Sequence, residues 1–134
     1  MITEYVFEVT TLRPVRSHER SVFNDLAQAL AALDDLPSDW SVIYVAALGK
    51  GIDYGNFYLF LNGSGAAHIM LHEHREHFAA DPLRRSKGGN VEFLDEDGSA
   101  FNVATELTTS AARGKKALKH WLPAQAQWPE LIWQ

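Results

Sequence analysis

The sequence predicts an α+β domain in which two main helices pack against a single, mostly antiparallel sheet. Runs that alternate apolar or β-branched residues with polar ones recur along the chain, as in strands with one buried face. Short stretches of turn-forming residues join several of these runs, which favours antiparallel neighbours. Helical spacing of apolar residues occurs in two segments. The length of 134 residues fits one domain, so we expect residues 1–134 to fold as a single unit.

The N-terminal part is predicted to form a strand followed by a helix. Residues 5–11 alternate aromatic and β-branched side chains, which indicates a strand. Ser17 or Ser21 can then cap a helix, because a hydroxyl accepts a hydrogen bond from an unpaired N–H of the first turn. Apolar residues repeat at helical spacing over residues 22–33, and the polar, proline-containing segment 34–37 is expected to end the helix.

The middle of the chain is predicted to supply three strands. Residues 40–48 are apolar on both faces, as in a central strand. Residues 49–55 form a glycine-rich loop that lacks the Gly-Lys-Ser/Thr ending of a phosphate-binding loop. Residues 56–61 and 66–73 are two further strands, and the Asn-Gly-Ser-Gly stretch at 62–65 is expected to join them in a hairpin turn.

A polar connection and a second hairpin follow. Residues 78–87 are polar, contain a proline and are expected to be an exposed, mobile connection. Residues 91–94 and 101–107 are strand-like and flank the acidic segment 95–98, which ends in Asp-Gly. Asp-Gly between two such runs is a strong hairpin signal.

The C-terminal part is predicted to form a helix and a docked tail. Residues 111–122 carry an apolar stripe with basic residues outside it, and the hydroxyl residues 108–110 offer three possible N-caps. Pro123 is expected to stop this helix. The tail at 131–133, Leu-Ile-Trp, is too apolar for a frayed end, so we expect a final edge strand or docking on the sheet.

The C-terminal sequence resembles one family of known proteins. The stretches Ala-Leu-Lys-His-Trp-Leu at 117–122 and Pro-Glu-Leu-Ile-Trp at 129–133 are similar to the C-terminal half of an immunity-protein family of bacterial polymorphic toxin systems. The partners of that family are often secreted nucleic-acid deaminase toxins. The resemblance covers about a third of the chain. It implies a toxin inhibitor rather than an enzyme, with no cofactor and no catalytic residue.

Composition limits the classes of partner. The absence of cysteine excludes disulfides, thiolate catalysis and cysteine metal sites, and it fits a cytoplasmic protein. The formal net charge of -5 argues against nonspecific nucleic-acid binding and suits a basic protein partner. No run approaches the roughly 20 apolar residues that span a membrane. The N-terminus also lacks the pattern of a signal peptide.

Toxin binding by this chain would require an acidic face that covers a basic substrate cleft. Carboxylates near the second hairpin are the candidates for its charge, and two aromatic residues are candidate anchors because aromatics are enriched at interface hot spots. These seven candidate toxin-binding residues are Glu92, Asp95, Glu96, Asp97, Glu106, Tyr54 and Trp128.

Two other functions stay open. His68, His72 and His74 share one face of a strand, which would allow a small metal-dependent enzyme. His72 and His74 have a spacing that can place two imidazoles on one metal ion, and a third ligand would have to come from elsewhere, such as His77 across a bend. The stretch matches neither the His-Glu-x-x-His order nor its inverse, so a solvent-facing polar strand end without metal is the favoured interpretation. A regulatory or scaffold module without a toxin partner is the second alternative.

Overall fold

A computed structural model describes residues 1–84 and 88–134 of the chain. Its strands are β1 (Glu4–Thr11), β2 (Ser17–Phe23), β3 (Ser41–Gly49), β4 (Ile52–Leu61), β5 (Ala66–His72), β6 (Glu76–Ala80), β7 (Asn90–Leu94), β8 (Ala100–Ala104), β9 (Thr109–Ser110) and β10 (Ile132–Trp133). The helices are α1 (Leu26–Ala32) and α2 (Ala111–Ala124), with short 3₁₀ turns at Leu33–Asp35, Pro82–Arg84 and Thr105–Leu107.

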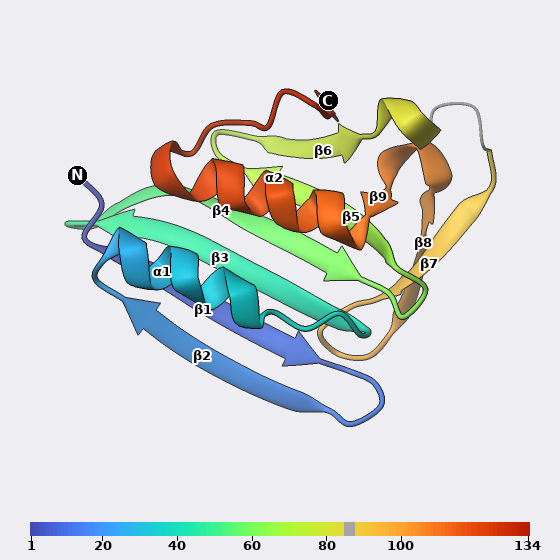
Figure 1. The fold of residues 1–134 in the computed structure, drawn as a ribbon, viewed down its shortest axis with the longest axis horizontal. Coiled ribbons are helices and arrows are strands. Elements are labelled where there is room, and N and C mark those ends of the chain that lie inside the picture. Colours follow the sequence, from blue (N-terminus) through green and yellow to red (C-terminus); the bar gives the residue numbers. More distant parts are fainter. Residues whose placement is uncertain (85–87) are drawn as a thin grey trace.

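The main sheet is antiparallel throughout its described pairings. Its strands lie in the order β10-β6-β5-β4-β3-β1-β2, and the short β9 pairs with the start of β5. Both helices lie on one face of this sheet (Figure 1). The predicted α+β class, with a mostly antiparallel sheet and two packed helices, is therefore confirmed.

The core between the sheet and α2 depends on a glycine. Alternate residues of the central strands point toward the helices, and Trp121 and Leu118 of α2 are fully buried against them. A Cβ on Gly114 would lie 2.8 Å from Leu59 Cδ1 and 2.9 Å from Ala67 Cβ. Glycine is a poor helix former, but here it lets the helix approach the sheet closely.

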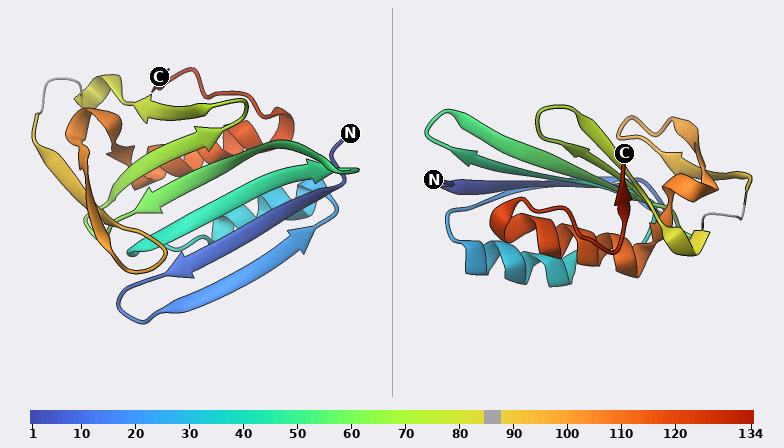
Figure 2. Two further views of the ribbon diagram at one scale, coloured as in Figure 1. Left: turned by 180° about the vertical axis from the view of Figure 1, so that it is seen from behind. Right: turned by 90° about the horizontal axis from the view of Figure 1, so that it is seen from above.

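The predicted second hairpin is confirmed, and it forms a separate two-stranded sheet of β7 and β8. It crosses the face of the main sheet opposite the helices (Figure 2). Phe93 and Val103 of the hairpin pack there on Val42 and Phe60, which makes a second, smaller core. The strand β8 ends at Ala104, shorter than predicted, because a 3₁₀ turn begins at the next residue.

The predicted start of the first helix is wrong. Ser17 and Ser21 lie in the edge strand β2, which pairs with β1 over its whole length. The helix begins at Leu26, and Asp25 caps it by accepting from the Ala27 N–H at 2.6 Å. Every residue of β2 except Phe23 is exposed, so its sequence lacks the alternation that marks a half-buried strand.

Three further boundaries differ from the predictions. The predicted loop over 49–55 is a two-residue turn of Lys50 and Gly51, both with positive φ, because β3 continues to Gly49 and β4 starts at Ile52. The predicted exposed connection over 78–87 contains the end of β6 and the buried Asp81, while its residues 85–87 lie outside the described part. Helix α2 continues one residue past Pro123.

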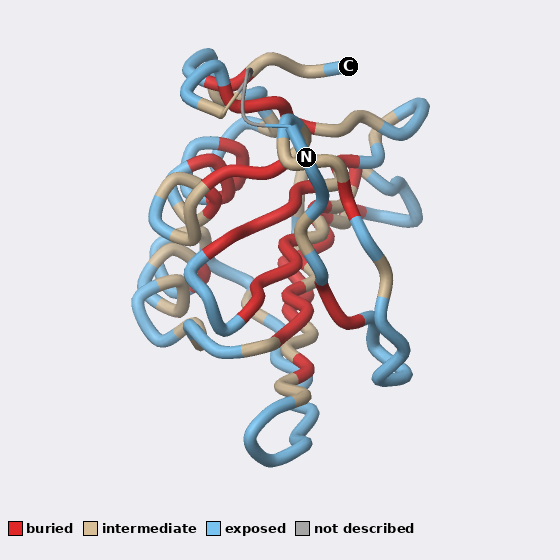
Figure 3. Tube along the Cα trace, turned by 90° about the vertical axis from the view of Figure 1, so that its right-hand side faces the viewer, coloured by how far each residue is buried: buried red, intermediate tan, exposed pale blue. Residues whose placement is uncertain are grey.

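The C-terminal tail forms the predicted edge strand. Ile132 pairs with Ala80 and Trp133 with Ala79, which places β10 at one end of the main sheet. Leu131 is buried in the helix-side core. Seen end on, the buried residues concentrate in the sheet and on the inner side of the helices, while the outlying turns are exposed (Figure 3).

Candidate protein-binding face

A row of aromatic side chains crosses the sheet on the face opposite the helices. Antiparallel pairing sets Tyr44 of β3 beside Tyr58 of β4, with their ring centroids 4.9 Å apart. Tyr58 stacks on Phe60 at 6.0 Å, and Phe60 stacks on His68 of β5 at 5.8 Å. The row exists because side chains two apart on a strand, or paired across strands, share one face.

The hairpin covers one end of this row and leaves the other end open. Phe93 and Phe101 pack over the Phe60 and His68 end, with the Phe60 and Phe101 rings 5.2 Å apart in an edge-to-face arrangement. The face uncovered by β7 and β8 extends over β3, β1 and β2 (Figure 2). Tyr44 and Tyr58 are half-buried at this boundary, so their rings are held in place and still reach solvent.

Carboxylates gather around the open tyrosine pair. Glu8 of β1 pairs directly with Tyr44 across the strands. Glu96, in the turn of the second hairpin, is held nearby because Arg16 donates a hydrogen bond to its carbonyl at 2.8 Å. We call Glu8, Tyr44, Tyr58 and Glu96 the acidic tyrosine face.

The titration behaviour of these groups reflects their crowding. Partial burial raises the pKa of Glu96, and the neighbouring charges of Asp95 and Glu8 raise it further against an opposing effect of His18. Burial also raises the pKa of Tyr58, followed by the charges of Glu96, Glu8 and Asp95. The like charges on the acidic tyrosine face therefore repel one another, and a cation from a partner would reduce this repulsion.

Basic side chains also lie on this face: Arg16 contacts the Glu96 carbonyl, Arg20 pairs with Glu8 across the strands, and His18 contacts Glu8. The Nδ1 of His18 lies 2.8 Å from the Thr10 hydroxyl, and its Nε2 lies 3.5 Å from Glu8 Oε1. Both side chains of this pair are largely exposed, and exposed pairs contribute little to stability.

The predicted acidic residues do not all lie on this face. Asp95 and Asp97 are exposed in the hairpin turn beside Glu96, but Asp97 has a local role. Its carboxylate accepts from the Ser99 hydroxyl and N–H, and these bonds lower its pKa. Glu92 is exposed on β7, and Glu106 lies in the 3₁₀ turn after β8, beyond the opposite end of the hairpin.

The two predicted aromatic anchors lie on the helix side of the sheet. The Tyr54 hydroxyl accepts from the N-terminal amine of Met1 at 2.5 Å, and its ring packs against the helix-side core. Trp128 packs against the same core, with the Arg113 guanidinium 5.0 Å from its ring centroid. The structure therefore does not bring Tyr54 and Trp128 together with the hairpin carboxylates.

The predicted solvent-facing position of His68 is wrong. Its side chain is buried under the hairpin, stacked on Phe60 and Phe78, and Nδ1 donates to the Leu107 carbonyl at 3.0 Å. Burial lowers its pKa, with the Leu107 bond acting in the opposite direction. His72 and His74 are exposed, and within residues 1–84 and 88–134 no three potential metal ligands gather into a site.

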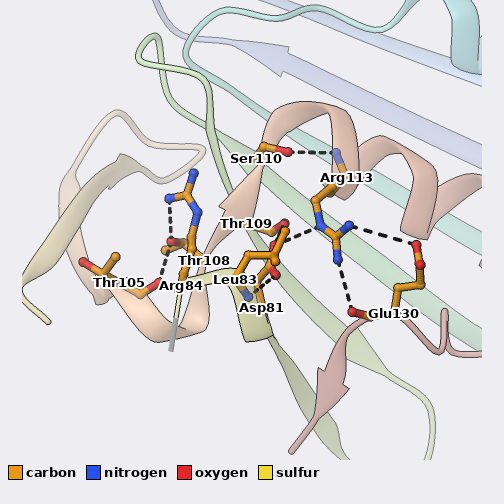
Figure 4. Close-up of polar contacts among 9 residues, drawn as sticks. All are labelled: Asp81, Leu83, Arg84, Thr105, Thr108, Thr109, Ser110, Arg113 and Glu130. Atoms are coloured by element: carbon orange, nitrogen blue, oxygen red, sulfur yellow. Dashed lines mark hydrogen bonds and ion pairs between the residues drawn. The ribbon is translucent and has the colours of Figure 1, made fainter. Parts of the chain in front are cut away.

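A buried ion pair that was not predicted joins α2 to the sheet edge and the tail. The Asp81 carboxylate accepts from Arg113 Nε at 3.0 Å, the Thr109 hydroxyl and the Leu83 N–H (Figure 4). Arg113 also donates to the Glu130 carbonyl at 3.2 Å. The sequence does not predict this network, because Asp81 lies just before a proline in a segment with the composition of a loop.

A scan against protein-family models found no match for this chain, and a search of curated proteins found no significant similarity. The resemblance to an immunity-protein family thus stays a prediction. Among the helices that the structure describes, none is long and apolar enough to cross a membrane.

Proposed function

We propose that this protein is a cytoplasmic immunity protein that binds a cognate bacterial toxin domain and occludes its active site. The toxin would be a nucleic-acid-directed enzyme, with a deaminase as the class implied by the C-terminal resemblance. One observation carries the proposal: the carboxylates of Glu8 and Glu96 surround a half-exposed tyrosine pair on an open face of the sheet.

The chemistry of such a toxin is complementary to this face. An enzyme that acts on nucleic acid needs lysine and arginine side chains to hold phosphates. An inhibitor with carboxylates in matching positions can occupy that cleft in place of the substrate. The net charge of -5 adds a long-range attraction that accelerates encounter.

The tyrosine pair would supply apolar contact area and cation–π contacts, which the carboxylates cannot provide. Two adjacent rings present apolar area with hydroxyl groups at their ends, and both are already ordered by their neighbours. Tyrosine is enriched at binding hot spots, and an aromatic face can hold a lysine or arginine through a cation–π contact. A pre-ordered anchor also reduces the entropy lost on binding.

The proposal is tested by reversing Glu8 and Glu96 to lysine together. The toxin domain encoded immediately upstream is the partner for the binding measurement. We expect association to slow at least about tenfold at low salt, because electrostatic steering is lost, and protection of toxin-expressing cells to weaken. The control reverses Asp34 and Asp35, two exposed carboxylates outside the acidic tyrosine face, and so changes the net charge equally. Equal association rates for both double variants would contradict the proposal, as would the absence of a toxin domain upstream.

A second variant separates binding from folding. Since the pKa of Glu96 is raised in the folded protein, its ionised form makes the folded state less stable than a neutral side chain would. Glu96→Gln is therefore expected to keep or increase the free energy of unfolding at pH 7 while weakening toxin binding. A fall in stability that accounts for the weaker binding would assign Glu96 a structural role instead.

A further inference from the structure

The outer edge of β2 is a long, regular strand edge. β2 is last in the strand order, and its seven residues pair with β1 in consecutive register without a bulge. The opposite edge of the sheet is formed by β10, which has only two residues. Natural sheets usually protect their edges with short strands, prolines or bulges, because unpaired N–H and C=O groups can pair with another chain. β10 is protected by its length, whereas β2 has none of these three features and carries charged side chains, Glu19 and Arg20, as its protection.

A groove lies beside this edge on the helix side. It has a volume of about 350 Å³ and lies between β1 and β2 on one side and the segment after α1 on the other. Phe7, Val9 and Phe23 give it an apolar lining, and Leu36 and Pro37 lie across from them. A groove of this size is within the range of natural small binding pockets.

The charge of the groove is acidic. Glu19 of β2 pairs with Val9, which places its side chain on the helix side, and Asp35 lines the groove from the 3₁₀ turn after α1. No lysine or arginine is among the described residues that line it. Arg20 pairs with Glu8 and therefore points to the opposite face of the sheet.

We propose that this edge and groove bind an extended segment of another protein, which adds to β2 as a further strand. The backbone of the segment would pair with the free edge of β2. A lysine or arginine of the segment would lay its aliphatic stem on Phe7 and Val9 and bring its charge to Glu19 and Asp35. This is strand addition, in which main-chain bonds give affinity and alternate side chains give specificity. It is a second surface, on other residues than the acidic tyrosine face.

A second copy of this chain is a poorer occupant. In the antiparallel register that pairs two β2 strands over all seven residues with both helix layers on one side, Arg20 at the centre would face its own copy. Like charges directly opposite each other destabilise a strand pair. A lysine-bearing segment meets the groove carboxylates instead.

The test uses backbone-cyclised β-hairpin peptides whose outer strand is Thr-Val-Lys-Val-Thr, because a closed hairpin is already ordered for pairing. Matched peptides replace the lysine with norleucine or glutamate, and a fourth carries N-methyl groups on the outer amides. Binding is followed by NMR titration of the labelled protein. We expect resonances of β2 and of the groove to shift, with the lysine peptide binding about tenfold tighter than the norleucine peptide, since a charge-assisted bond is worth about one decade in affinity. The N-methyl peptide should not bind.

Protein variants complete the test. Glu19→Gln combined with Asp35→Asn should remove the preference for lysine and leave the weak norleucine affinity unchanged. Glu19→Lys combined with Asp35→Lys should transfer the preference to the glutamate peptide, a gain that misfolding cannot produce. Absence of a lysine preference, resonance shifts on the acidic tyrosine face alone, or self-association through β2 would overturn the proposal. None of these outcomes bears on toxin inhibition, because the peptides are not toxins.

Discussion

His68 is a titratable group enclosed by aromatic rings, and this makes folding stability depend on pH. Its pKa in the folded protein is lowered by burial, while the unfolded chain has the ordinary value of about 6.5. The unfolded state therefore binds more protons as the pH falls below about 6.5, and the stability contributed by neutral His68 is lost there. Above that pH the contribution is fully present.

We therefore expect the free energy of unfolding to decrease between pH 6.5 and pH 5, as measured by urea denaturation. His68→Phe should reduce this pH dependence, because the side chain no longer takes up a proton. His120→Phe serves as the control, since His120 is exposed on α2. An unchanged pH dependence in His68→Phe would show that other groups cause the loss.

Asp81 illustrates a buried charge that depends on its partners. Burial alone would raise its pKa, but the bonds from Thr109 and Leu83 and the charge of Arg113 outweigh burial and lower it. Removal of one charge of a buried ion pair leaves the other charge buried without a partner, which typically lowers the free energy of unfolding by about 3–5 kcal/mol.

Asp81→Asn is accordingly expected to lower the free energy of unfolding by about 3 kcal/mol at pH 7, measured by denaturant titration. Glu130→Gln is the matched control, because Glu130 is 62% exposed and its carboxylate is 4.0 Å from Arg113. Exposed pairs contribute about 0–1 kcal/mol. Similar losses in the two variants would mean that Asp81 acts through general packing rather than through its charge.

The C-terminal tail is held to the rest of the fold by strand pairing, by burial and by a side-chain hydrogen bond. Its strand β10 pairs with β6, Leu131 is buried, and the Trp133 indole donates to the Trp128 carbonyl at 2.9 Å. Burial of one large apolar side chain is worth roughly 1.5–3 kcal/mol, a large share of a typical stability of about 5–15 kcal/mol.

Deletion of residues 129–134 should therefore give an unstable or insoluble protein, as judged by soluble yield and thermal unfolding. Gln134→Ala, which keeps the backbone of the tail, should behave like the parent. A truncated protein that unfolds at the parental midpoint would show that β10 contributes little to the stability of the fold.

The whole fold was largely predictable because most strands have one buried face. The alternation in residues 5–11 and the turns at 62–65 and 95–98 correspond directly to β1 and to two hairpins. β2 was missed since an edge strand exposed on both faces carries no such pattern. Gly114 is a poor helix former within α2, and its place there follows only from the close packing of the helix on the sheet.

The candidate site was predicted only in part. Glu96 was found because acidic residues in a hairpin turn are conspicuous, but Glu8, Tyr44 and Tyr58 each lie inside a strand with an ordinary composition. Their proximity follows from the register of β1, β3 and β4 and from the hairpin that crosses the sheet. Register and the placement of one sheet over another are tertiary properties, which local sequence does not specify.

The position of the last strand also has a consequence for protein synthesis. β9 and β10 complete the side of the sheet formed by β5 and β6, and α2 covers its core, yet all three follow these strands in the chain. While the ribosome still encloses these residues, the emerged strands expose apolar surface that nothing has yet covered. Domains tend to fold as units, and such partly folded species are prone to aggregate. The apolar side of β5 and β6 therefore stays uncovered until α2 and β10 have emerged.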